Sequence, residues 1–275
     1  MMFFKRLLDF YINSSVHVSL AVLSFCVLSA YDLDLKSSLN FYCAVFCASV
    51  AGYNFVKYFG ITKFYYRSLT TKLKYIQLVS VLSLMGFGYA FLALQLCSQI
   101  LFIFLGVITF FYAIPMGVKT PKNLRSAGGV KIYIIALVWT MTTVVLPILE
   151  SQQTLVTDHW ILIVQRMFVV IVLMLPFEIR DLDSDQLHLS TIPQKIGIQY
   201  TKIIGYALLG DSILLEFFKQ EFNQNRFLIA LFLVATVAIF LAKSTRKKNR
   251  YYTIFWVEAI PIVTLFFAIV ISLAQ

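Results

Sequence analysis

Charged residues are scarce in this 275-residue sequence, where they make up only 13% of the chain, and just 13 residues are acidic. No Asp or Glu occurs between Asp34 and Glu150. Soluble globular domains typically contain about 25% charged residues. This scarcity, together with 60% hydrophobic residues and a mean hydropathy of +0.83, excludes an ordinary soluble protein. The composition indicates a chain that needs lipid as its solvent.

Cysteine is also rare, with four residues in the chain. Cys43 and Cys47 are spaced i, i+4, but neither has a neighbouring His or a further Cys that could complete a metal site. We therefore expect the cysteines to pack within helices rather than to bind metal.

Long polar linkers, low-complexity stretches and strong internal repeats are missing as well. We expect residues 1–275 to form a single integral membrane domain. The first apolar run lacks a convincing small-residue cleavage site, so it is interpreted as a first membrane span rather than as a signal peptide.

Apolar runs recur along the whole chain, and each is about long enough to cross a hydrocarbon core of roughly 30 Å. The runs are continuous rather than alternating, which favours helices over strands because helices satisfy their own backbone groups in lipid. The predicted fold is therefore all-α and polytopic. The nine predicted transmembrane helices occupy residues 13–30, 38–59, 75–96, 99–114, 130–149, 159–177, 199–218, 226–242 and 251–271.

The distribution of Lys and Arg predicts the orientation. If the N-terminus is cytoplasmic, 19 of the 23 basic residues lie on the cytoplasmic side, whereas the outer loops hold only Lys36, Lys219 and Arg226. The C-terminus is then outside. The net charge of +10 is chiefly a topology signal, and nucleic acid is not an expected partner.

Four acids lie within eight residues directly after the sixth apolar run, namely Glu178, Asp181, Asp183 and Asp185. On a helix Asp181 and Asp185 share a face, one turn apart. Two carboxylates with this spacing beside a membrane cavity suit Mg²⁺, which prefers oxygen ligands and shares its remaining positions with substrate phosphates. The alternative is a solvated loop after a membrane span.

The residues around these acids resemble a known motif. "EIRDLDSD" followed by "STIPQKIG" is similar to the second aspartate-rich motif of the UbiA superfamily of intramembrane prenyltransferases, which reads RDxxxD and then TxPxxxG. "FYAIPMGVKTPKNLRSAGGVKIYIIALVW" also resembles the basic cytoplasmic loop between helices four and five of that family. The residues that match the second motif are Arg180, Asp181, Asp185, Thr191, Pro193 and Gly197.

The resemblance implies a UbiA-type bundle that transfers a prenyl group from an allylic isoprenyl diphosphate to an aromatic or other lipid-soluble acceptor. It implies that Asp181 and Asp185 are catalytic residues that bind Mg²⁺. Membrane lipids are also expected partners of the protein. It also places the protein in the bacterial inner membrane with a cytoplasmic active site. The implied diphosphate-binding residues are Lys57, Lys119, Lys122, Arg125, Lys131 and Arg180.

The first aspartate-rich motif of the family, NDxxDxxxD, is degenerate here. The corresponding stretch is "NFVKYFGIT", in which Asn54 matches and is assigned to the catalytic site. The three aspartate positions hold Phe55, Tyr58 and Thr62, while Lys57 adds a positive charge that can face a diphosphate. The alternative is therefore a catalytically inactive UbiA homologue that binds an isoprenoid lipid or supports a membrane complex. A transporter is less well supported, because no pair of broken helices stands out.

Ionisable residues within predicted spans need partners. His17 and Glu258 are interpreted as members of interhelical hydrogen bonds near the cytoplasmic side. Arg166 lies deep in the sixth span, and helix geometry places Asp211 at nearly the same depth. We therefore expect an ion pair between Arg166 and Asp211.

Overall fold

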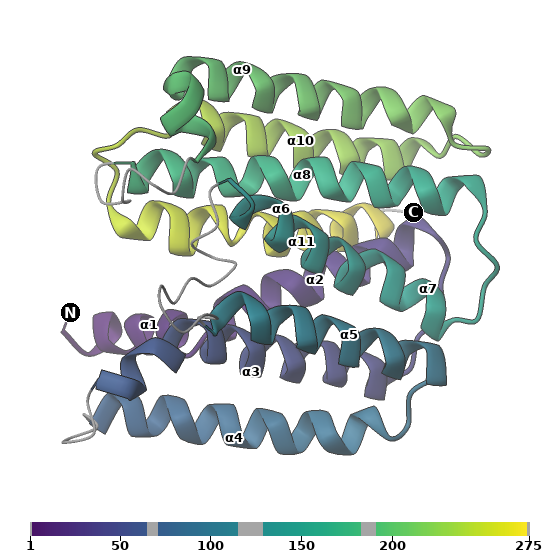
Figure 1. The fold of residues 1–275 in the computed structure, drawn as a ribbon. Coiled ribbons are helices and arrows are strands. Elements are labelled where there is room, and N and C mark those ends of the chain that lie inside the picture. The colour runs from purple at the N-terminus through teal and green to yellow at the C-terminus, as the bar shows by residue number, and fades with distance from the viewer. Residues whose placement is uncertain (1, 65–70, 115–128, 183–190, 274–275) are drawn as a thin grey trace.

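A computed structural model describes residues 2–64, 71–114, 129–182 and 191–273. Within these residues the chain forms helices and no strand, which confirms the all-α prediction. The helices run roughly side by side, with α4 and α9 at opposite margins of the bundle (Figure 1). In chain order the elements are α1 Met2–Asn13, α2 Val16–Asp32, α3 Leu39–Phe64, α4 Thr71–Phe91, α5 Leu96–Ala113, α6 Lys131–Thr140, the π-helix η2 Met141–Val145, α7 Leu146–Glu150, α8 Thr157–Asp181, α9 Ile192–Leu214, the 3₁₀ turn η4 Leu215–Phe218, α10 Gln224–Lys243, the π-helix η5 Tyr252–Val257 and α11 Ile260–Leu273.

Helices occupy all nine of the predicted apolar runs. Seven described helical segments are long and apolar enough to cross a membrane, and the bent pair of α1 and α2 would make an eighth. The more polar α9 is not among them. These helices indicate an integral membrane protein. The number of nine membrane crossings stays a prediction.

The core lies between the central helices. α2 packs against α3 and α11, and α8 packs against α6, α9 and α10. Phe25, Phe41 and Leu175 are almost completely buried there. By contrast, α4 exposes large apolar side chains such as Leu82, Met85 and Tyr89. Such a surface is stable against lipid and would be unfavourable in water.

The chain bends before the first predicted span. α1 and α2 meet at 59°, and Ser15 between them has a positive φ of 62°, which is uncommon outside glycine. α1 carries Lys5 and Arg6 beside exposed Phe4 and Leu7. This mixture is typical of a helix that lies in the membrane interface. The sequence-based boundary at residue 13 missed this helix.

A second bend interrupts α9 near its start (Figure 1). Gly197 has φ 79° and ψ 166°, a region that only glycine occupies readily. The turn before it is fixed by the Thr191 N–H, which donates to Gln194 Oε1 at 3.0 Å, and by Pro193 in the first turn of the helix. The TxPxxxG stretch is therefore a helix start followed by a glycine break. We call the end of the bundle where α8 ends and α9 starts the motif end.

Candidate active site at the motif end

The last turn of α8 fixes a carboxylate. Arg180 donates from Nε to Asp181 Oδ1 at 2.6 Å and from Nη2 to Asp181 Oδ2 at 2.9 Å. Its Nη1 donates to the hydroxyl of Thr253 in η5. A two-point guanidinium contact restricts the carboxylate to one plane. Because each carboxylate oxygen has two lone pairs, the contact with Arg180 by itself does not saturate Asp181.

Asn54 on α3 is buried and its amide faces α4. Its side chain is only 3% exposed, and its Nδ2 donates to Ser80 Oγ on α4 at 2.9 Å. The Ser80 hydroxyl donates in turn to the Ile76 carbonyl, so the orientation of the amide is fixed. Among the described residues Asn54 Oδ1 has no hydrogen-bond donor. A buried acceptor of this kind calls for a donor or a cation.

Lys57 lies one turn further along α3 and points to the end of α1. Its Nζ donates to the Ile12 carbonyl at 3.1 Å and to the Asn13 carbonyl at 3.4 Å. The Tyr58 hydroxyl donates to the same Asn13 carbonyl at 2.8 Å. Carbonyl groups at a helix C-terminus lack intrahelical donors, and a cation there is favourable. Lys57 and Tyr58 therefore tie α1 to α3.

Glu258 completes the polar part of the site. It follows η5 and lines a small cleft together with Trp139, Phe177 and Pro261. Lys57 and Arg180 both lie close enough to affect this carboxyl group electrostatically. The interhelical hydrogen bond expected for Glu258 from the sequence stays a prediction.

His17 lies beside this region and is hydrogen bonded on both ring nitrogens, to the Tyr11 hydroxyl at 2.9 Å and to the Phe255 carbonyl at 2.9 Å. The prediction of interhelical hydrogen bonding is confirmed for His17. Behind it, Trp139 Nε1 donates to the Tyr53 hydroxyl, which joins α6 to α3.

The residues of the stretch that was compared with the first aspartate-rich motif have the following contacts in the structure. Phe55 packs on Phe59 at 4.9 Å and stacks parallel to Phe110 of α5 at 6.1 Å, measured between ring centroids. Tyr58 holds α1, as described above. Thr62 belongs to α3, and its side chain lies outside the described residues. Phe55 is therefore engaged in ring packing, and Tyr58 in a hydrogen bond to the end of α1.

The structure describes part of the predicted site. Asn54, Lys57, Arg180 and Asp181 lie at the motif end, and Lys131 is the first residue of α6 at the same end. Asp185, Lys119, Lys122 and Arg125 lie outside the described residues. No group of three or more His, Cys, Asp or Glu residues that could hold a metal is found within the part of the chain that is described. The oxygens of Asp181 and Asn54 nevertheless have the chemistry that Mg²⁺ prefers.

Sequence reasoning missed Thr253 and Ser80, because single hydroxyl residues in apolar helices carry no spacing signal. It was also wrong about Arg166. This guanidinium donates to Ser29 Oγ at 2.9 Å and lies 3.9 Å from the ring centroid of Phe25, whereas Asp211 is exposed.

No protein-family model matches the sequence, and no curated protein matches it. Among solved structures, a UbiA homologue from Aeropyrum pernix K1 is similar with a TM-score of 0.66 at 14% identity, over 93% of this chain and 98% of that one. The chain has the UbiA fold. A UbiA homologue from Archaeoglobus fulgidus bound to GPP and Mg²⁺ has a TM-score of 0.64 at 10% identity, over 95% of this chain and 98% of that one. A structure of digeranylgeranylglyceryl phosphate synthase has a TM-score of 0.58 at 14% identity, over 97% and 98%.

Proposed function

We propose that this protein is a Mg²⁺-dependent prenyltransferase of the UbiA type, which transfers a prenyl group from an allylic isoprenyl diphosphate to a lipid-soluble acceptor. The observation that carries the proposal is the oriented Arg180 and Asp181 pair at the end of α8, in a fold shared with homologues that bind GPP or DMAPP with Mg²⁺. Residues 1–275 would act as one domain. The acceptor would be an aromatic compound or another lipid-soluble molecule.

Asp181 and Asp185 would hold the Mg²⁺, and Asn54 Oδ1 is a further oxygen available to the ion or to its water. Bound there, Mg²⁺ would act as a Lewis acid that neutralises the departing diphosphate. Arg180 keeps the Asp181 carboxylate in place. Lys57, Lys119, Lys122, Arg125 and Lys131 would donate to phosphate oxygens, and the apolar walls would keep water from the allylic group.

The packing of Phe55 and Tyr58 favours a second candidate, a UbiA homologue that binds an isoprenoid lipid without turning it over. α3 then contributes an amide and an ammonium group but no carboxylate. The two candidates differ in whether a prenyl group reaches an acceptor.

The deciding experiment incubates purified protein in nanodiscs with labelled prenyl diphosphates of several lengths, a membrane extract as acceptor, and either Mg²⁺ or a chelator. The transferase proposal expects labelled lipid that disappears with chelator and in Asp181→Asn. Asp211→Asn serves as the control, because Asp211 is exposed on α9. Saturable diphosphate binding without labelled product for any chain length would instead favour the second candidate.

A further inference from the structure

A separate cavity, apolar over most of its lining but with charged residues on one side, lies at the end of the bundle opposite the motif end. Its volume is about 70 Å³, and it is lined by residues of α2, α8, α9 with η4, α10 and α11. By the measure used for buried waters this is room for about five of them. Arg166 in its wall precedes Arg180 by 14 positions on α8, which corresponds to about 21 Å along the helix. The cavity is therefore not part of the proposed active site.

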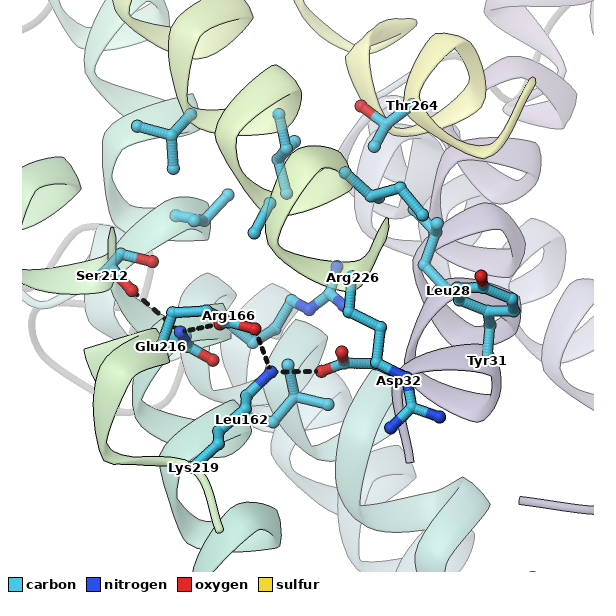
Figure 2. A pocket seen from close by; sticks show the side chains of 16 residues that line it. Leu28, Tyr31, Asp32, Leu162, Arg166, Ser212, Glu216, Lys219, Arg226 and Thr264 are labelled. Carbon is cyan, nitrogen blue, oxygen red and sulfur yellow. Dashed lines mark hydrogen bonds and ion pairs between the residues drawn. The ribbon is translucent and has the colours of Figure 1, made fainter. Parts of the chain in front are cut away.

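Charged side chains gather on one side of this cavity (Figure 2). Lys219 donates to Asp32 Oδ2 at 2.7 Å and to Glu216 Oε1 at 2.7 Å. Gln165 Nε2 donates to Glu216 Oε2 at 2.7 Å. The two carboxylates and the single ammonium are thus mutually satisfied, and they bind α2, α8 and η4 together.

On the charged side of the cavity, Arg166 has an unsatisfied hydrogen-bond donor. It is 5% exposed and uses Nη2 for Ser29, but its Nη1 has no acceptor among the described residues. Arg226 also lines the cavity, and its acceptor Asp34 stands outside with a side chain 79% exposed. With Asp34 included, the three cations of the lining are matched by three anions, and among the described residues Arg166 is the cation of this lining that forms no ion pair. A buried guanidinium donor without an acceptor is costly, so the site favours an incoming anionic oxygen.

The other side of the cavity is apolar and lies deeper in the bundle. On α2 Leu28 precedes Asp32 by one turn, and on α10 Ile229 and Leu233 follow Arg226 by one and two turns. Both directions lead from the end of the bundle toward its middle, by about 5 to 10 Å. The lining is consequently charged near the end of the bundle and apolar further inside. A lipid has the same order of a charged head followed by an apolar chain.

We propose that this cavity binds a single-chain anionic amphiphile from the leaflet that faces it. The anionic head would accept from Arg166 Nη1 at the charged side, and the first carbons of the chain would pack on Leu28, Ile229 and Leu233. A free phosphate has the negative charge but no apolar chain, and an uncharged fatty alcohol has the chain but no negative charge.

Native mass spectrometry of the protein in phosphatidylcholine nanodiscs, titrated with oleate, oleyl alcohol or inorganic phosphate, tests this. One saturable oleate site is expected, and Arg166→Gln should weaken it about tenfold or more because a charge-assisted hydrogen bond is lost. Oleyl alcohol should bind the parent protein about as weakly as oleate binds the Arg166→Gln variant. Phosphate should show no binding.

A second pair of variants keeps the test decisive if Arg166→Gln does not fold. Ala230→Trp places a large ring in the cavity lining, whereas Leu231→Trp puts the same ring on the exposed side of the same helix. Only Ala230→Trp should abolish oleate binding. Equal binding in the two variants, equal binding of oleyl alcohol and oleate, or tight binding of phosphate alone would each overturn the proposal.

Discussion

At the scale of single residues, Asp181 is held in one orientation because both of its oxygens accept from Arg180. We predict that Asp181→Ala or Asp185→Ala lowers Mg²⁺-dependent prenyl transfer by about a hundredfold or more, since several kcal/mol of charge stabilisation is lost. Asp183→Ala should have a smaller effect. The rate of labelled product formation measures this, with detergent-solubilised thermal unfolding as the folding control. Full activity in an Asp181/Asp185 double variant would contradict the metal assignment.

Lys57 and Tyr58 provide a matched pair. Both donate to the end of α1, but only Lys57 brings a charge. Lys57→Met is expected to weaken the binding of a prenyl diphosphate analogue about tenfold, the effect of one charge-assisted contact. Tyr58→Phe should leave this affinity within about twofold.

Calorimetric titration with the analogue and Mg²⁺ gives both dissociation constants. Loss of affinity in both variants would show that the position of α1, rather than the ammonium charge, controls binding. An unchanged affinity in Lys57→Met would remove this residue from the diphosphate site.

The Arg166 error shows what depth alone can predict. Counting residues at 1.5 Å each placed Asp211 level with Arg166, which fixes the position along the helix axis but not the face. Ser212 and Glu216 are buried on the α9 and η4 side facing α8, whereas Asp211 is exposed. The helix face was not readable from the sequence, because α9 has apolar residues all around and a glycine break near its start.

At the scale of elements, the start of α9 depends on Gly197. We predict that Gly197→Ala lowers the free energy of unfolding by about 1 to 3 kcal/mol, because φ 79° with ψ 166° is strained for a residue with a Cβ. Gly210→Ala is the control. An added Cβ there meets no atom within 4 Å, and alanine is the better helix former.

Thermal unfolding in detergent should therefore separate the two variants in opposite directions. Equal stability of Gly197→Ala and the parent protein would mean that the break in α9 relaxes without cost.

The helices over the nine apolar runs were predictable because hydropathy gives each run a strong local signal. α1 was not, because Lys5 and Arg6 interrupt its apolar pattern and the bend depends on the backbone of Ser15. The contacts of Lys57 with Ile12 and Asn13 were equally hidden. They depend on how α1 folds back onto α3, which no spacing encodes.

At the scale of the whole molecule, the predicted orientation can be tested with cysteines. Cys97 is exposed near the start of α5, at the end opposite the motif end, and Lys247 is exposed at the motif end. A variant that retains only Cys97 should react with a membrane-impermeant maleimide in intact cells. A variant whose only cysteine comes from Lys247→Cys should react only after lysis. The reverse pattern would place the motif end outside.

The helix α4, at one margin of the bundle, has few helix neighbours among the described residues. Only 11% of its span is buried within the protein, and its packing is mainly against α3, where Gly86 allows a close approach to Cys47. We expect annular lipid to cover the large apolar side chains that this helix exposes, which would make the bilayer part of its packing. Because Ser80 of α4 accepts a hydrogen bond from Asn54, we expect a change in bilayer thickness that shifts α4 to reach this amide as well.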